Sequence, residues 1–434
     1  MTTYARRLGS FSAAMAVVGG IIGSGIFVGP AVVAQRVGTA NLTIAAWALG
    51  GVIALAGAFC FAELGARRPA AGGSYVYLRD AFGPLPAFLY GWMLLFAIST
   101  GATAAVAVTF ARYLLPLFGL SETAELPVAA VTILGLSILN YRGVRPAAFT
   151  VNVFTVLKLG ALAVVILAGI AMTRVETLSF PVATTGTSVA VALGAALVPV
   201  LFAYGGWQQT NFIAEEIIEP EKRLPRALLL GTAIVVLVYV GANLSYLHAL
   251  GVQGLAMSRA PAADLMFQSL GAAGLKFVSA AIAVSTFGFL NLVILVTPRV
   301  YQAMAADGLF FSGLARLHPK FQTPSGAIVF QGVWATALVF TGTYGDLLDW
   351  VVFADWIFFG LTAATLFVFR KKEPHAPFRT PGYPIVPGFF VAAAIYVVGS
   401  SIWANPRNAL MGTVLLVLGV PVFKLWDRSR RAAA

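Results

Sequence analysis

Apolar segments long enough to cross a lipid bilayer recur along nearly the whole chain. Of its 434 residues, 59% are hydrophobic and 10% are charged, whereas soluble domains carry about 25% charged residues. A membrane-spanning helix needs roughly 20 consecutive apolar residues. The runs are long and do not alternate between polar and apolar residues, which favours helices over the strands of a barrel. The sequence therefore predicts an all-α integral membrane protein.

We expect about twelve transmembrane helices in a single membrane domain, residues 1–434. The first apolar stretch is too long for the apolar region of a signal peptide, so we expect it to remain as the first span. The expected spans are 11–35, 41–66, 84–114, 126–141, 145–172, 188–217, 226–250, 272–304, 325–342, 346–370, 383–403 and 407–426.

Basic residues are distributed unevenly between the two sides of the membrane. The chain has 28 Lys and Arg residues, 16 Asp and Glu residues and a net charge of +12. With a cytoplasmic N-terminus, 21 basic residues fall on the cytoplasmic side, 6 fall on the outer side, and Lys158 lies inside a span. This asymmetry follows the positive-inside rule and explains the charge without a nucleic-acid partner. We expect both termini in the cytoplasm and the chain in the plasma membrane, which is the inner membrane of a bacterium.

Glycine clusters interrupt the first and the sixth spans. The first span has five glycines between Gly19 and Pro30, and the sixth contains Tyr204-Gly205-Gly206. Each glycine costs about 1 kcal/mol relative to alanine inside a helix, so both spans should open near the middle. Interrupted spans at corresponding positions of two halves point to the binding site of a transporter. Close packing of helices through small residues is the alternative explanation.

An interrupted span has a chemical consequence. Lipid cannot satisfy the backbone groups of an unwound turn, so these groups must face protein, water or substrate. A half-helix that begins after the break suits a carboxylate, because its free N–H groups carry the positive end of the helix dipole. A half-helix that ends before the break offers carbonyl groups to an ammonium. Since a zwitterionic amino acid carries both groups, it is the predicted small-molecule ligand.

Several stretches carry a family resemblance over most of the chain, in order: Ile21–Phe27, Ala62–Pro69 continuing into Gly72–Tyr77, Phe202–Trp207 followed by Glu215 and Glu216, Val238–Asn243, and Phe378–Pro384. They resemble the amino acid–polyamine–organocation (APC) superfamily, most closely the L-type amino acid transporter branch and its bacterial relatives. The resemblance implies the leucine-transporter fold, built as a 5+5 inverted repeat. The implied parts are a cytoplasmic tail (1–10), a first repeat (11–172), a second repeat (188–370) and two additional C-terminal helices (383–426).

The resemblance also implies where the α-amino and α-carboxyl groups of a substrate are held. Both groups would sit at the two breaks, and Phe202 would act as a gate over the substrate. The implied substrate-binding residues are Ile21, Ser24, Gly25 and Ile26 in the first span, and Phe202, Ala203 and Gly205 in the sixth.

Lys158 is the one basic residue deep inside a span. A buried ammonium is costly unless it is paired, and Lys158 lies too far from the end of its span to snorkel easily to the interface. The resemblance implies that its amine takes the place of a structural sodium ion between spans one and eight. We therefore expect transport that does not depend on sodium. Whether Lys158 releases a proton, as in a proton symporter, or stays charged, as in an exchanger, is left open.

The expected partners of Lys158 come from three spans. They are the carbonyl groups of Gly20 or Ile21, the hydroxyl groups of Ser285 or Thr286, and the side chain of Tyr239. Polar packing between helices is the alternative role for Tyr239.

A cluster of charged residues follows the sixth span. It is either a solvated loop or a cytoplasmic gate made of ion pairs, and Glu63 at the end of the second span allows the same two interpretations. The cluster comprises Glu215, Glu216, Glu219, Glu221, Lys222, Arg223 and Arg226.

Several partners and functions are not favoured. The three histidines have no metal-ligand spacing, so we expect no metal and no cofactor. L-type transporters of animals carry a cysteine between spans three and four that bonds a heavy chain, but residues 112–125 contain none. We therefore expect no disulfide-linked heavy chain. A membrane enzyme would need clustered acidic residues or histidines inside the spans, and the spans are nearly free of acids.

The sequence favours a transporter of small neutral amino acids. The sixth-span break, residues 203–206, contains no acidic residue, whereas some relatives that carry cationic amino acids have one there. A polyamine or cationic amino acid transporter would need carboxylates in the cavity, and the sequence reveals none. A sensor that binds amino acids without moving them is not excluded, because only flux separates it from a transporter.

Overall fold

The computed structural model describes residues 4–173, 188–342, 344–404 and 406–433, and only the backbone of 344–353, 404 and 429–433. The described chain is helical throughout, apart from connecting turns and one isolated parallel bridge between Leu8 and Ile217. The all-α prediction is therefore confirmed.

Each of the twelve expected segments corresponds to one helix or one series of helices. In chain order they are α1 (Ser10–Ile21) with α2 (Gly25–Val37), α3 (Ala40–Arg67), α5 (Pro84–Met93) with η1 (Leu94–Ile98) and α6 (Ser99–Leu114), α7 (Glu125–Tyr141), α8 (Val144–Ala171), α9 (Val189–Tyr204) with η4 (Trp207–Glu216), α10 (Pro220–Met257), α12 (Ala272–Val296) with α13 (Pro298–Ala306), α14 (Ser325–Thr341), α15 (Tyr344–Lys372), α16 (Ile385–Ala404) and α17 (Pro406–Ala433). Shorter elements connect them: α4 (Ser74–Phe82), η2 (Leu115–Phe118), η3 (Glu122–Ala124), α11 (Pro261–Leu270) and η5 (Ser312–Ala315).

Length and hydropathy identify most of these segments as membrane spans. Among the described residues, nine helices are long and apolar enough to cross a membrane, and α1 with α2, bent by 44°, makes a tenth. The short helix α14 has 17 residues, and α15 begins in residues whose side chains are not described. The expected repeat boundaries and the sidedness of the loops stay predictions. The count of basic residues on the two sides of the membrane includes Arg174, which lies outside the described residues.

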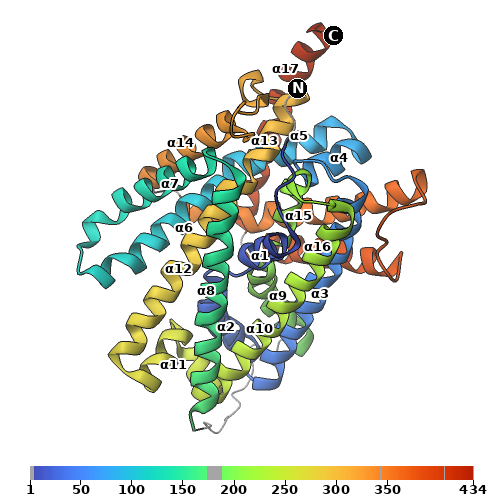
Figure 1. Cartoon of the computed structure of the whole chain (residues 1–434). Coiled ribbons are helices and arrows are strands. Elements are labelled where there is room, and N and C mark those ends of the chain that lie inside the picture. The colour runs from blue at the N-terminus through green and yellow to red at the C-terminus, as the bar shows by residue number, and fades with distance from the viewer. Residues whose placement is uncertain (1–3, 174–187, 343, 405, 434) are drawn as a thin grey trace.

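The interrupted helices lie at the centre of the bundle. In Figure 1, α1 lies near the middle of the molecule. α1 packs against α10 and α8, α2 packs against α9 and α10, and α3 runs along α10. A second group, in which α6 contacts α7, α12 and α14, flanks this centre and joins it through the contact of α12 with α8. The two breaks are thereby enclosed by protein rather than lipid, as exposed backbone groups require.

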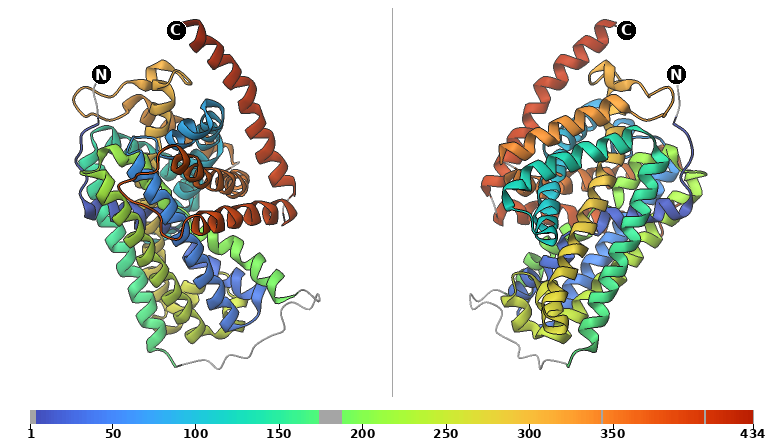
Figure 2. Two further views of the ribbon diagram at one scale, coloured as in Figure 1. Left: turned by 90° about the vertical axis from the view of Figure 1, so that its right-hand side faces the viewer. Right: turned by 60° about the vertical axis from the view of Figure 1, so that its left-hand side comes forward.

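The last two helices lie at the periphery. Figure 2 shows α17 extending along the outside of the bundle to a C-terminus at the same end of the molecule as the N-terminus. Only 22% of the apolar stretch of α16 and 17% of that of α17 is buried inside the protein. These helices therefore leave most of their apolar surface for lipid.

Candidate functional site

The first break separates α1 from α2 by three residues. Ile22 adopts an extended conformation (φ −75°, ψ 101°) after the last residue of α1, and Ser24 precedes α2 without capping it by its side chain. The first N–H groups of a helix have no acceptor within the helix. Since Ser24 and Gly25 line a cavity, the start of α2 can offer such N–H groups to a ligand there.

The second break ends α9 at Tyr204. Gly205 is extended (φ −63°, ψ 154°), and Gly206 has φ 122°, which favours glycine over any residue with a side chain. The chain then continues in 3₁₀ turns as η4, which is kinked at Ile213 (φ −106°, ψ 18°). The glycine clusters thus open both spans where the sequence predicts.

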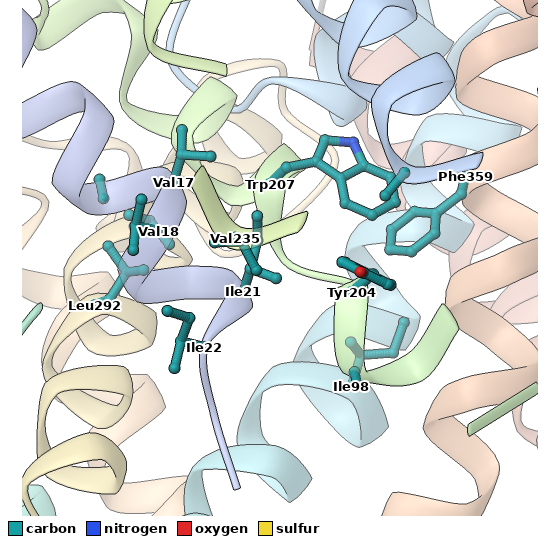
Figure 3. Close-up of a cluster of buried hydrophobic side chains, with 14 of the residues drawn as sticks. Val17, Val18, Ile21, Ile22, Ile98, Tyr204, Trp207, Val235, Leu292 and Phe359 are labelled. Atoms are coloured by element: carbon teal, nitrogen blue, oxygen red, sulfur yellow. The ribbon is translucent and has the colours of Figure 1, made fainter. Parts of the chain in front are cut away.

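The two breaks touch each other through their backbones. A Cβ atom on Gly206 would lie 2.1 Å from the carbonyl oxygen of Gly20, and a Cβ on Gly20 would lie 2.9 Å from that of Gly206. A Cβ on Gly25 would lie 3.2 Å from the Cβ of Ala203. Figure 3 shows the apolar side chains around this crossing, with Ile21 and Ile22 on one side and Tyr204 and Trp207 on the other.

A cavity of about 140 Å³ lies at this crossing. Its volume is roughly ten times the ~10–15 Å³ that a single water needs, so it can hold a small molecule. The gate candidate Phe202 is 48% exposed and borders the cavity. The cavity is lined by Gly20, Ile21, Gly23, Ser24, Gly25, Ile98, Ser99, Ala102, Val106, Leu201, Phe202, Ala203, Gly205, Gly206, Gln208, Gln209, Thr286, Phe289, Val293, Asp355, Trp356 and Phe359.

Six of the seven expected substrate-binding residues therefore line one cavity. The exception is Ile26, whose side chain is buried at 0% exposure and is not part of the lining. Its backbone N–H belongs to the first turn of α2, so this group, rather than the side chain, is what the residue can contribute.

Lys158 is fully buried on α8 and binds the first break. Its Nζ donates to the carbonyl oxygens of Gly19 at 3.1 Å and Ile22 at 2.7 Å. These are not the expected carbonyls of Gly20 and Ile21. Because residues three apart share one face of a helix, the end of α1 presents the carbonyls of Gly19 and Ile22 to α8 together.

The two hydroxyl groups expected beside Lys158 behave differently. The Ser285 hydroxyl lies 3.4 Å from the carbonyl oxygen of Ile22 and 3.5 Å from that of Gly23, so Ser285 and Lys158 share one acceptor. The Thr286 hydroxyl instead donates within its own helix, to Ile282 or Ala283. Thr286 borders the cavity but makes no contact of this kind to the break.

Tyr239 on α10 connects the two breaks and does not contact Lys158. Its hydroxyl lies 3.1 Å from the carbonyl oxygen of Ile21 and 3.2 Å from that of Ala203. The ring is held by Trp47 and Tyr204, at centroid distances of 5.6 and 5.1 Å. One hydroxyl proton can satisfy only one of the two carbonyls at a time, so the other remains available to an ammonium or a water.

Asp355 on α15 is a cavity residue that the sequence did not reveal. It lines the cavity beside Trp356 and Phe359, and the Phe359 ring lies 5.6 Å from that of Trp207, directly after the second break. This corrects the expectation that the cavity holds no carboxylate. An acid in the middle of the segment 346–370 was the available signal, but the sequence does not say which way that helix is rotated.

The end of the molecule that carries both termini is closed by buried ion pairs. Arg299 donates through Nε to Glu216 Oε1 at 2.8 Å, and both side chains are at most 1% exposed. The backbone N–H groups of Arg7 and Leu8 donate to the carbonyl oxygen of Glu216, each at 2.9 Å. Glu216 therefore belongs to a buried ion pair, as a gate made of ion pairs would require. Glu219 instead forms a partly exposed pair with Arg223, which is typical of a solvated loop.

Glu63 forms a second closed contact at this end. It is fully buried and accepts hydrogen bonds from Arg67 Nε at 2.9 Å, Arg370 Nε at 2.9 Å and the backbone N–H of Thr380 at 2.7 Å. These contacts connect α3, α15 and the segment before α16. Breaking one partner of a buried pair is costly, so Glu63 fixes these elements to one another.

Metal ligands do not gather anywhere in the part of the chain that the structure describes: no group of three or more His, Cys, Asp or Glu side chains there could hold a metal ion. The cation at the first break is instead the side chain of Lys158.

Comparisons with known proteins agree on a family of transporters. A family model described as amino acid permease matches residues 8–422. The large neutral amino acids transporter small subunit 2 of Mus musculus is 34% identical over 434 residues, covering 97% of this chain and 81% of the relative. The cystine/glutamate transporter of Homo sapiens is 32% identical over 426 residues (96% and 84%), and the human b(0,+)-type amino acid transporter 1 is 32% identical over 430 residues (97% and 88%). All three names specify amino acids as the transported molecules, but they do not specify one class of side chain.

Proposed function

This chain belongs to the amino acid permease family, and from that premise we propose that it is a sodium-independent secondary transporter of small amino acids that works by alternating access. The observation that carries the proposal is that the start of α2 and the end of α9 meet at one cavity. This arrangement offers N–H donors and carbonyl acceptors to the two ends of one zwitterion.

The α-carboxylate of the substrate would bind at the start of α2. The N–H groups of Ser24, which directly precedes α2, and of Gly25 and Ile26 in its first turn lie where the dipole favours an anion. Gly25 permits this approach, because a side chain there would meet Ala203. The α-ammonium would bind the carbonyl groups at the ends of α1 and α9, of which Ile21 and Ala203 already share the single hydroxyl of Tyr239.

Sodium independence is supported by the contacts of Lys158. Its ammonium supplies a fixed positive charge to the carbonyl groups of Gly19 and Ile22, where a bound cation could otherwise satisfy them. A cation that is part of the protein needs no ion gradient to be present. Both modes expected from the sequence, an exchanger and a proton symporter, are compatible with this role.

Alternating access would require the contacts at the end with both termini to open. The Glu216–Arg299 and Glu63–Arg370 pairs close that end, while Phe202 is exposed at the cavity. We propose that this end faces the cytoplasm, as the charge asymmetry indicates, and that the protein lies in the plasma membrane. We also propose that it works without a disulfide-linked heavy chain, since its one cysteine, Cys60, is buried in α3.

Two substrate classes follow from different parts of the cavity. The second break, with Ala203, Gly205 and Gly206, is uncharged and supports small neutral amino acids. Cationic amino acids are a second candidate class, favoured by one observation, the carboxylate of Asp355 in the lining.

Uptake of labelled alanine into proteoliposomes, with and without internal alanine and at two pH values, tests the proposal. An exchanger requires internal substrate, and a proton symporter accumulates alanine when the outside is more acidic. Saturable binding of amino acids without uptake under any of these conditions would instead identify a sensor and refute the proposed transport.

A further inference from the structure

Among the described residues that line the cavity, Asp355 is the one with a charged side chain. Its side chain is partly exposed there. Among the residues that the structure describes, no residue donates a hydrogen bond to its carboxylate or forms an ion pair with it. A carboxylate inside a membrane protein is costly unless it is paired. Its charge is therefore left for something that enters the cavity.

The surroundings of Asp355 favour a cationic group. Gln209 lines the same cavity, and its buried Oε1 has no hydrogen-bond donor among the described residues. Two unsatisfied acceptors suit an ammonium, which brings three donors and no acceptor. The rings of Trp356 and Phe359 follow Asp355 on the same helix and also line the cavity, and aromatic faces attract cations within about 6 Å.

The α groups of an amino acid do not use Asp355. The proposed binding sites for both lie at the two breaks, on α1, α2 and α9, whereas Asp355 lies on α15. The contact of Phe359 with Trp207 places this part of α15 beside the second break. A substrate held by its α groups can thus extend its side chain toward Asp355.

We propose that Asp355 binds the cationic end of the substrate side chain, so that this transporter prefers small amino acids with a side-chain amine over neutral ones of the same chain length. The inference rests on the proposed transport of amino acids and replaces the expectation of a purely neutral substrate, which was drawn from the second break alone.

Ornithine and norvaline form a matched pair for the test, because they differ only by the terminal amine. The measurement is how strongly each of the two competes with labelled alanine for binding to the purified full-length protein. It is made on the wild type, on Asp355→Asn and on Glu122→Gln, an exposed control on η3. We expect ornithine to bind more tightly than norvaline to the wild type. Asp355→Asn should weaken ornithine by ~30-fold or more, as expected when one partner of a desolvated charge pair is lost, and should leave norvaline within about twofold. The control variant should match the wild type.

The other outcomes refute the inference in distinguishable ways. A wild type that binds norvaline but not ornithine, or a variant that weakens both ligands equally, overturns the role of Asp355 and leaves amino acid transport intact. A variant that changes only the pH dependence of norvaline uptake would assign the carboxylate to proton coupling instead. If neither ligand competes in the wild type, the proposed function fails, and this inference fails with it.

Discussion

Replacing Lys158 by methionine should remove most of the transport activity. The substitution keeps an unbranched side chain but deletes both hydrogen bonds to the first break. The carbonyl of Ile22 keeps the distant hydroxyl of Ser285 at 3.4 Å, whereas among the described residues no other side chain donates to the carbonyl of Gly19. A buried polar group left without a partner costs about 1–3 kcal/mol, and a hydrogen bond from a charged donor contributes about 1.5–3 kcal/mol.

The loss of two charged hydrogen bonds is partly offset, because the desolvation cost of the ammonium disappears as well. The first break should therefore lose about 2 kcal/mol or more of the stabilisation that holds its geometry. Since 1.4 kcal/mol is a factor of ten, this loss corresponds to a fall in transport of ~30-fold or more.

The assay is initial uptake of labelled alanine into proteoliposomes, with the amount of inserted protein and its thermal stability measured for each variant. Lys276→Met, which alters an exposed lysine at the start of α12, is the matched control and should behave as the wild type. Uptake by Lys158→Met equal to that of the control would refute the idea that this ammonium substitutes for a bound cation.

Three further predictions concern the carboxylate site, the topology and the charged surface. Gly25→Val should abolish substrate binding while the protein still inserts and purifies, and amino acid esters should bind poorly to the wild type; unchanged affinity in the variant would remove Gly25 from the site. Reporter fusions at Glu122 and Arg428 should report opposite sides of the membrane, and a common side would show that the number of spans between them is wrong. The Arg68 guanidinium donates to Glu373 and holds the pKa of that carboxyl below its usual value. The small stabilisation that Glu373→Gln removes should therefore be present near neutral pH and vanish as the pH falls below about 4. A difference in melting temperature between variant and wild type that is equal at neutral pH and below about pH 4 would contradict this pairing.

Local chemistry made the central part of the fold predictable from the sequence. Glycine clusters weaken helices wherever they stand, so the ends of α1 and α9 could be located before any packing was known. Lys158 could be recognised because an ammonium in the middle of a span must find acceptors. Its acceptors, Gly19 and Ile22, differ from those expected because they depend on how the end of α1 is rotated toward α8.

Features that depend on tertiary packing were not predictable in the same way. Asp355 is visible in the sequence, but only the rotation of α15 turns it toward the cavity rather than toward a neighbouring helix. The pairing of Leu8 with Ile217 joins segments that are about 200 residues apart, and no local pattern signals it. The burial of Glu216 beside Arg299 likewise depends on packing between distant segments, while Glu219, three residues further on, stays partly exposed.

We propose that the ammonium of Lys158, a cation built into the protein, replaces a bound sodium ion beside a site for amino acids. The most direct test is the initial rate of labelled amino acid uptake by the wild-type protein in proteoliposomes, with all sodium on both sides replaced by choline. We expect the same rate in the two media. A rate that collapses in choline and returns with added sodium would contradict it.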